Sequence, residues 1–526
     1  MTAFVYRDFP TLRAALVAGQ ELALIDVREE AEFAASHPLF AVNIPLSKLE
    51  LEIYRRIPRR TTPIVVYDAG EGLAEQAAGR LRQFGYDDVA LLSGGLAGWR
   101  AAGGEIFQDV NTPSKAFGEL VENRRNTPSL TAEQVKALID RHADVVIVDA
   151  RRFDEYQTMS IPTSTSVPGA ELVLRIHALA PNPDTRVIVN CAGRTRSIIG
   201  TQSLINAGIP NPVAALRNGT IGWGLAGFAL EHQQQRRYPD SADNLAQARQ
   251  QARRVADEAG VRRIDRETLA LWQRDTARTT YLFDVRNPEA YRAGHVAGSH
   301  STPGGQLVQE TDHYASVRGA RVVLVDDDGV RANMSASWLA QMGWEVAVLD
   351  GLTADDFSEQ GDPAAVLPPA PPADEITPAQ LAELLEQPGT VLLDFTTSAN
   401  YVARHIPGAH WVIRSRLSLA LENLPPAERY VLTCGSSLLA RYAAPDVAAL
   451  TGKPVRLLAG GTQAWIAEDR PLVSGEDRLI SPRIDRYRRP YEGTDNPREA
   501  MQAYLDWEFG LVAQLERDAT HGFNVL

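Results

Sequence analysis

The same pattern of residues recurs four times along this chain of 526 residues. Each copy begins with a short apolar run that leads into Asp, and the four runs are Leu24–Arg28, Ile147–Arg151, Leu282–Arg286 and Leu392–Thr396. Apolar runs of this length, bounded by polar residues, are typical of strands in a parallel sheet that is covered on both faces. A chain of this length also corresponds to three or four domains of ordinary size. The repeat therefore predicts tandem domains and excludes a single large core.

A second apolar run follows in each copy, and the residue after it differs between the copies. These runs are Ile64–Tyr67, Val187–Asn190, Val322–Val325 and Tyr430–Thr433. The residues that follow them are Asp68, Cys191, Asp326 and Cys434. The interval from the first Asp to this position is 42 residues in the first three copies and 40 in the fourth. Such constant spacing indicates common ancestry of the four copies.

Helical segments and a glycine turn complete each copy. Residues 197–208 carry apolar side chains at helical intervals and end in Gly208. Three copies close with a turn and Trp, at Gly94–Trp99, Asn218–Trp223 and Gly460–Trp465, whereas the third copy has Asp350-Gly351-Leu352 followed by Phe357. Strands that alternate with helices predict an α/β fold in which each domain is a small doubly wound parallel sheet with right-handed crossovers.

The joints between the copies set the expected domain boundaries. We predict domains at residues 1–105, 128–235, 262–362 and 374–475, followed by a helical tail at 476–526. A charged helical stretch around Ser241–Arg263 separates the second and third domains, and the Pro-rich segment 363–378 predicts a stiff spacer. The tail has a partial apolar stripe, formed by Met501, Tyr504, Leu505, Phe509, Val512 and Leu515. Packing of this stripe on the fourth domain is the favoured interpretation, and a dimerisation helix is the alternative.

Composition and charge exclude several classes of function. Hydrophobic residues make up 44% and charged residues 23%, which is normal for globular protein. The net charge of −13 disfavours binding to nucleic acid or to an anionic membrane. No signal peptide or membrane-spanning run is evident, and two cysteines cannot form a disulfide framework, so we expect a cytoplasmic protein. The scattered histidines show no metal-ligand spacing, and no Gly-rich loop is followed by Lys-Ser/Thr, so neither a metal nor a nucleotide is expected.

Several of these motifs occur together, and in order, in one known family. Asp-x-Arg after a strand, a His-x-x-Gly element (His295–Gly298 and His405–Gly408), a Cys-headed loop and Gly-Gly-x-x-x-Trp together resemble the rhodanese family. The whole chain resembles four tandem rhodanese-like domains. The resemblance implies a sulfurtransferase in which a cysteine takes sulfane sulfur from a donor such as thiosulfate, becomes a persulfide and passes the sulfur to a thiol or cyanide acceptor, without a cofactor. The first and third domains have Asp68 and Asp326 at the cysteine position, so we expect them to be inactive.

Cys191 is the expected nucleophile. It opens the loop Cys191–Arg196 between an apolar strand and a helix, where successive backbone N–H groups and the helix dipole favour an anion. We therefore expect a lowered thiol pKa, with Arg194 and Arg196 lowering it further and binding an anionic donor. The predicted substrate-binding residues are Ala192, Gly193, Arg194, Thr195 and Arg196. Asp149 and Arg151 are expected to form a structural pair at the strand end.

Two other interpretations of Cys191 fit the loop sequence less well. A cysteine at a strand end is often a small packing residue, but a packing residue needs no cationic loop. Phosphatases also use Cys in an anion-binding loop closed by Arg, but their pattern has five residues before the Arg, whereas four separate Cys191 from Arg196.

Cys434 opens a less cationic loop, Cys434-Gly435-Ser436, whose start resembles that of mercaptopyruvate sulfurtransferases. It is a possible second site or a buried structural thiol. The alternative to an enzyme is a scaffold of rhodanese-like domains that binds proteins with little turnover. The physiological donor, the acceptor and the oligomeric state stay open.

Overall fold

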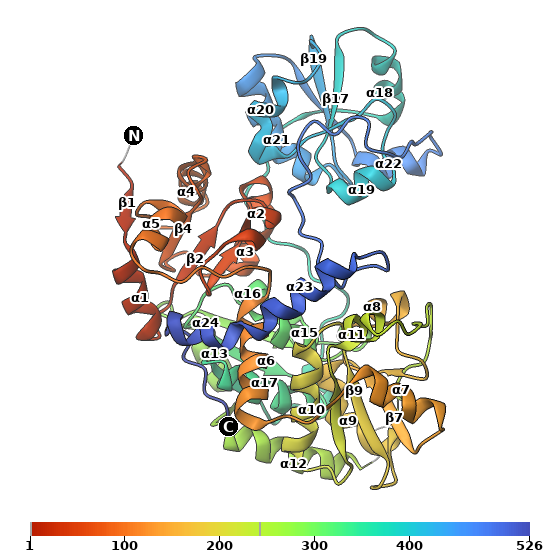
Figure 1. Ribbon diagram of the computed structural model, residues 1–526. Coiled ribbons are helices and arrows are strands. Elements are labelled where there is room, and N and C mark those ends of the chain that lie inside the picture. The colour runs from red at the N-terminus through yellow and green to blue at the C-terminus, as the bar shows by residue number, and fades with distance from the viewer. Residues whose placement is uncertain (1–2, 241–243) are drawn as a thin grey trace.

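The computed structural model describes residues 3–240 and 244–526, which form four α/β domains and a helical C-terminal tail (Figure 1). Residues 1–2, in the predicted first domain, and residues 241–243, at the start of the predicted charged linker, lie outside the described residues. Each domain contains one parallel sheet of five strands, with the orders β1-β5-β4-β2-β3, β6-β10-β9-β7-β8, β11-β15-β14-β12-β13 and β16-β20-β19-β17-β18. The predicted fold class and the four tandem domains are confirmed.

Domains 1 and 2 contain matching sets of elements. The strands of domain 1 are β1 (Val5–Arg7), β2 (Ala23–Asp26), β3 (Ala41–Asn43), β4 (Ile64–Tyr67) and β5 (Val89–Leu92), and its helices are α1 (Phe9–Val17), α2 (Glu30–Ala35), η1 (Leu46–Lys48), α3 (Leu49–Arg56), α4 (Leu73–Gln83) and α5 (Gly95–Ala101). The strands of domain 2 are β6 (Ser129–Leu130), β7 (Val145–Asp149), β8 (Thr165–Ser166), β9 (Arg186–Asn190) and β10 (Val213–Leu216), and its helices are α7 (Ala132–Asp140), α8 (Phe153–Thr158), η2 (Gly169–Glu171), α9 (Leu172–Leu179), α10 (Thr195–Ala207) and α11 (Gly219–Leu225).

Domains 3 and 4 repeat the arrangement. The strands of domain 3 are β11 (Arg262–Ile264), β12 (Thr280–Asp284), β13 (His300–Ser301), β14 (Arg321–Val325) and β15 (Glu345–Leu349), and its helices are α13 (Arg266–Arg274), α14 (Pro288–Ala293), α15 (Gly304–Gln309), α16 (Thr311–Tyr314), α17 (Arg331–Gln341) and η3 (Ala354–Asp356). The strands of domain 4 are β16 (Asp374–Ile376), β17 (Thr390–Asp394), β18 (His410–Trp411), β19 (Arg429–Thr433) and β20 (Val455–Leu458), and its helices are α18 (Pro378–Leu385), α19 (Ser398–Ala403), η4 (Arg414–Arg416), α20 (Leu417–Leu421), α21 (Leu438–Thr451) and α22 (Gly461–Ala467).

The apolar runs of the sequence form the inner strands of each sheet. In domain 2, β7 and β9 pair in parallel with Asp149 opposite Asn190, so the polar residues that end both runs lie at the same edge of the sheet. The four residues of β4 are all buried, as expected for a strand with helices on both faces. Where the third domain lacks the Trp turn, the short 3-10 helix η3 replaces the α-helix that follows the last strand in the other three domains.

The domains contact one another in pairs through equivalent segments. In domains 1 and 4, η1 contacts η4, and in domains 2 and 3, η2 contacts α15. Buried ion pairs accompany both interfaces: Arg414 donates to Glu50 at 2.7 and 3.0 Å, and Arg331 donates to Glu171 at 2.7 Å. Domains 1 and 3 also touch, since the Tyr281 hydroxyl donates to the carbonyl oxygen of Arg56 at 2.5 Å. Because the two ion pairs are buried, loss of either partner leaves a buried charge uncompensated and destabilises the interface.

The expectation that the apolar stripe of the tail packs on the fourth domain is wrong. Only the segment before the helices stays there, with Leu479 and Ile484 against the core of domain 4. Helices α23 (Arg498–Phe509) and α24 (Leu511–Asp518) then run back beside α6 (Thr112–Arg125), a buried helix between domains 1 and 2 (Figure 1). Leu515 of the stripe is buried in a core cluster of domain 1, and Tyr504 and Leu505 are buried against Ile221 of domain 2, so the stripe removes apolar surface from water at these two domains.

Two further features bear on the function classes. Among the helices of the described residues, none combines the length and the apolar character needed to cross a membrane. Within the same ranges, no group of three or more His, Cys, Asp or Glu side chains is placed to hold a metal ion. The charged linker between domains 2 and 3 forms helix α12 (Leu245–Glu258) over its described part.

Candidate functional site

Cys191 lies in the turn between β9 and α10, at the carboxyl edge of the second sheet. The side chain is 1% exposed. Its carbonyl oxygen accepts from the backbone N–H of Thr220 at 3.0 Å, and the carbonyl oxygen of Ala192 accepts from Ile221 at 3.0 Å. The first turn of α11 thus holds the start of the loop in place.

A glycine allows this close approach. Gly219 has φ +54°, and a Cβ added there would lie 2.3 Å from the carbonyl oxygen of Cys191. The same contact recurs in domains 1 and 4. A Cβ at Gly95 would lie 2.8 Å from the backbone carbonyl oxygen of Asp68, and a Cβ at Gly461 would lie 2.4 Å from the backbone carbonyl oxygen of Cys434. The glycine of the Trp turn is therefore needed for the close packing of α11 against the loop, and its left-handed φ also favours Gly.

The expectation of a lowered thiol pKa at Cys191 is wrong for this arrangement. Burial raises the pKa of the thiol above its ordinary value. The charge of Arg196 and the hydrogen bonds from the side chain and backbone of Ser197 lower it, but they offset the burial only in part, and Glu508 raises it further. The favourable charge and hydrogen bonds at the loop therefore do not outweigh the burial of the thiol.

Arg194 binds carboxylates of the neighbouring helix α6. Its guanidinium donates to both carboxylate oxygens of Glu119 on α6, at 2.6 and 2.9 Å, and also to Glu122. The ring of Phe509 on α23 lies 4.3 Å from its Cζ. Its charge is therefore shared with two carboxylates, and its contacts join the loop to α6 and to the tail helix.

Arg196 lies at the border of two large cavities. One, of about 510 Å³, is formed between domains 2 and 3 and is lined by Phe153, Tyr238 and Gly304 among others. The other, of about 540 Å³, is formed between domain 2 and the tail segment 486–493. The guanidinium donates to Glu155 at 2.7 and 2.9 Å, and although burial opposes it, the charge of Arg196 lowers the pKa of Glu155 to about 2. Arg196 is thus positioned between the Cys191 loop and space large enough for a small anion.

The other predicted residues also surround the loop. Asp149 accepts from the backbone N–H and Nε of Arg151 at 3.0 and 2.9 Å, and Arg151 in turn donates to the carbonyl oxygen of Met159 at 2.6 Å. Thr195 opens α10 and is buried, and its hydroxyl makes no hydrogen bond to any part of the chain that the structure describes. The contacts of Asp149 and Arg151 join the end of β7 to the end of α8.

Sequence reasoning missed the groups that the tail and α6 bring to the loop. A Cβ at Gly193 would lie 3.1 Å from Cε1 of Tyr504 and 3.3 Å from Oε2 of Glu508, so α23 lies directly over the loop. Glu119 and Glu155, which bind the two arginines, are also not among the site residues predicted from the sequence. The sequence carries no local signal for these contacts, apart from the tail stripe that contains Tyr504.

Cys434 lies in the equivalent turn of domain 4 and is 6% exposed. Burial raises its thiol pKa, whereas backbone N–H groups of Ala440, Leu439 and Ser437 lower it. Thr396 replaces the arginine of the Asp-x-Arg element there, and burial without that partner raises the pKa of Asp394 to about 7. Three N–H groups therefore face the Cys434 thiol, and no arginine is among the largest contributions to its pKa.

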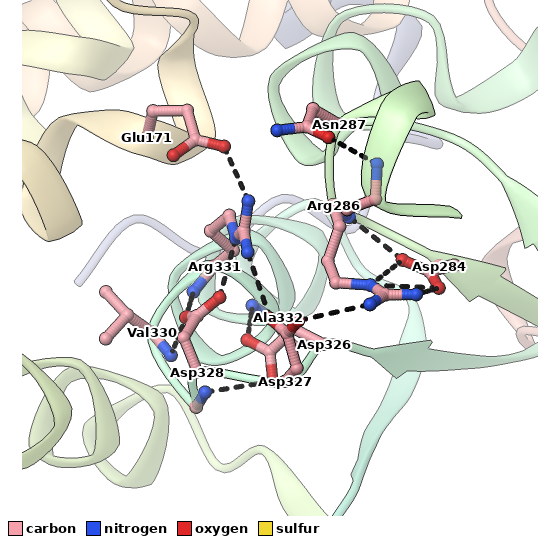
Figure 2. Close-up of polar contacts among 12 residues, drawn as sticks. Glu171, Asp284, Arg286, Asn287, Asp326, Asp327, Asp328, Val330, Arg331 and Ala332 are labelled. Carbon is pink, nitrogen blue, oxygen red and sulfur yellow. Dashed lines mark hydrogen bonds and ion pairs between the residues drawn. The ribbon is translucent and has the colours of Figure 1, made fainter. Parts of the chain in front are cut away.

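In domains 1 and 3, aspartate takes the position of the cysteine and accepts the N–H groups of its own loop. Asp68 accepts from Gly70, Leu73 and Ala74 at 3.0, 2.7 and 3.0 Å. Figure 2 shows the third domain, where the Asp326 carboxyl accepts from Gly329 at 3.0 Å and Ala332 at 2.7 Å. The carboxyl oxygens thus occupy the N–H groups that could otherwise bind an anion.

The comparisons with known proteins agree with the repeated fold. The model of the rhodanese-like domain family matches residues 10–102, 131–226, 267–352 and 377–468, so the chain belongs to this family. A crystal structure of thiosulfate sulfurtransferase from Pseudomonas aeruginosa is 71% identical with a TM-score of 0.98, and the match covers 99% of this chain and 100% of that one.

Two curated relatives match over shorter segments. An uncharacterised protein of Synechocystis sp. is 33% identical over 90 residues, which is 17% of this chain and 49% of the relative. An uncharacterised protein of Bacillus subtilis is 39% identical over 83 residues, which is 16% of this chain and 62% of the relative. The chain thus spans about half the length of the first relative and less than two thirds of the second.

Proposed function

We propose that this protein is a rhodanese-type sulfurtransferase that moves sulfane sulfur from thiosulfate, or a similar donor, to a thiophilic acceptor through a persulfide on Cys191. The observation that carries the proposal is the position of Cys191 at the carboxyl edge of its sheet, with Arg196 between its loop and the two cavities. The overall similarity to the thiosulfate sulfurtransferase of Pseudomonas aeruginosa supports the same class of activity.

The chemistry needs one nucleophile and an anion site. The Cys191 thiolate attacks the outer sulfur of thiosulfate, a new S–S bond forms, and sulfite leaves with the electron pair of the broken bond. An acceptor such as cyanide then attacks the outer sulfur of the persulfide and becomes thiocyanate, which returns the electron pair to the thiolate. Because burial raises the pKa of the Cys191 thiol, its ionisation adds to the cost of the first step at neutral pH.

Mass spectrometry tests the proposal directly. After incubation with thiosulfate and removal of the excess donor, the peptide that contains Cys191 is expected to gain the mass of one sulfur atom, and brief treatment with cyanide should remove it. If the Cys191 peptide stays unmodified with thiosulfate, with mercaptopyruvate and with a thiol persulfide, the sulfurtransferase proposal is wrong. The scaffold of rhodanese-like domains would then be favoured.

We assign donor binding to Arg196 and the anchoring of the loop to Arg194. Substitution Arg196→Ala removes a charge-assisted contact to the donor, and we expect the KM for thiosulfate to rise by about ten- to a hundredfold. Arg186→Ala, at the exposed start of β9, is the matched control. Arg196→Lys keeps a positive charge opposite Glu155 and should recover part of the loss. An unchanged KM in Arg196→Ala would remove Arg196 from the donor site.

Cys434 is a candidate second sulfur site, because three backbone N–H groups face its thiol. The start of its loop resembles that of mercaptopyruvate sulfurtransferases, so mercaptopyruvate is the donor to test there. For domains 1 and 3 we propose a supporting role without sulfur transfer, since Asp68 and Asp326 offer no sulfur nucleophile and accept the loop N–H groups themselves. The contacts of domain 3 with domain 2 hold the active domain in place.

A further inference from the structure

The C-terminal helix α23 places a buried carboxyl group against the Cys191 loop. Tyr504 and Glu508 lie one helical turn apart and face Gly193, with Oε2 of Glu508 3.3 Å from the position of a Cβ at this glycine. Glu508 is 0% exposed, and Arg194 of the same loop approaches the helix at Phe509. The tail helix thus packs directly against the loop.

The two oxygens of Glu508 have different surroundings. The Tyr504 hydroxyl donates to Oε1 at 2.9 Å. Oε2 is buried and has no hydrogen-bond partner within residues 3–240 and 244–526. In a neutral carboxyl group the carbonyl oxygen is the better acceptor, so the oxygen that accepts from Tyr504 is the carbonyl oxygen and the proton belongs on Oε2. An O–H group without an acceptor then points at the loop. A buried polar group without a partner costs free energy, and a ligand that accepts its hydrogen bond removes this cost.

The charges around Glu508 favour this neutral form. Burial and the neighbouring carboxylate of Glu119 raise its pKa to about 8, although Lys115, Tyr504 and Arg194 act in the opposite direction. Lys115 already donates to Asp109 at 2.6 Å, and Arg194 already binds two carboxylates, so neither cation is left to neutralise an ionised Glu508. An ionised Glu508 would also raise the pKa of the Cys191 thiol, so the two acidic groups disfavour each other's ionisation.

We propose that Glu508 is a further substrate-facing residue of the sulfur-transfer site, whose neutral carboxyl group donates a hydrogen bond from Oε2 to an oxyanion held over the Cys191 loop. The oxyanion is the sulfonate end of thiosulfate before transfer and sulfite after it. This proposal rests on the proposed function and adds that the site selects donors with a compact oxyanion. Loss of the proton replaces a hydrogen-bond donor by a negative charge beside a dianion, so oxyanion binding is coupled to one proton on Glu508.

The test measures thiosulfate binding in a protein whose Cys191 is replaced by serine, so that ionisation of the thiol cannot contribute to the pH dependence. Calorimetry gives the Kd of thiosulfate for full-length Cys191→Ser and for Cys191→Ser with Glu508→Gln, from below to above pH 8. In the single variant we expect the Kd to be constant below the pKa of Glu508 of about 8 and to rise by up to tenfold per pH unit above it. Glutamine stays neutral and keeps an N–H donor, so the double variant should change by less than about twofold over the same range.

The control is Glu499→Gln, at an exposed position in the first turn of the same helix, which should keep the pH profile of the Cys191→Ser parent. Superimposable profiles with and without Glu508→Gln overturn the proposal, and so does the absence of thiosulfate binding at every pH. If Glu508→Gln does not fold, Tyr504→Phe serves instead, because it removes the hydroxyl that directs the proton to Oε2 and should weaken binding at pH 7. Failure of the proposed function is a separate result, since it appears as an unmodified Cys191 in the wild-type protein.

Discussion

Replacement of Cys191 by serine is expected to lower kcat/KM for sulfur transfer from thiosulfate to cyanide by about a thousandfold or more. A hydroxyl group is a far weaker nucleophile than a thiolate at neutral pH, and it cannot hold a sulfane sulfur. The side chain is 1% exposed and the substitution is nearly isosteric, so the fold should survive. Thiocyanate formation at several pH values measures the effect.

The same variant decides the role of Cys434. If Cys434 is a second sulfur site, the Cys191→Ser protein should still gain one sulfur on the Cys434 peptide, most readily with mercaptopyruvate as the donor. No label on Cys434 with any donor would make it a structural thiol. Thiosulfate turnover in Cys191→Ser at the wild-type rate would instead contradict the assignment of Cys191 as the nucleophile.

Replacement of Gly219 by alanine is the second change with a large expected effect. The new Cβ would lie 2.3 Å from the carbonyl oxygen of Cys191 and 2.8 Å from the carbonyl carbon of Ala192, so the loop or α11 has to move. A displacement of about 1 Å at a reacting group costs about a hundredfold in rate. We therefore expect kcat to fall by about a hundredfold although Cys191 itself is unchanged. Steady-state kinetics and the thermal midpoint should be measured together.

Gly227→Ala is the matched control for this prediction. Gly227 also has a positive φ, of +81°, but a Cβ there would meet no atom of the described chain within 4 Å. It should therefore cost only the left-handed backbone strain of about 1–2 kcal/mol in the free energy of unfolding and leave kcat unchanged. If both variants lose the same activity, the contact between Gly219 and the loop has no special role.

Much of the fold was predictable because its signals are local. The buried strands appear as apolar runs of fixed length, and the repeat positions Cys191, Cys434, Asp68 and Asp326 at the same point of each domain. The Trp turn indicates where α5, α11 and α22 begin. In each case, the residues that determine the structure are neighbours in the sequence, so backbone preferences and periodicity are enough.

The electrostatics of the candidate site were not predictable in this way. The loop sequence suggests two arginines around a thiolate, but Arg194 binds Glu119, 75 residues earlier in the chain, and Glu122. The loop sequence predicts a lowered thiol pKa, whereas burial of the thiol raises it. A pKa depends on the water and the charges within a few ångströms in space. Arg196 and Ser197 are visible in the loop sequence, but the degree of burial and the charge of Glu508 are not.

The sequence by itself determined four rhodanese-like domains, the position of each cysteine or aspartate at a strand end, and the loop that carries Arg196. Only the tertiary structure decided that α6 and the C-terminal helix close over the Cys191 loop and bring Tyr504 and Glu508 to it. The physical reason is that local structure follows from short-range backbone and side-chain preferences. The choice of surface for an amphipathic helix depends instead on which apolar face in the folded chain removes the most surface from water.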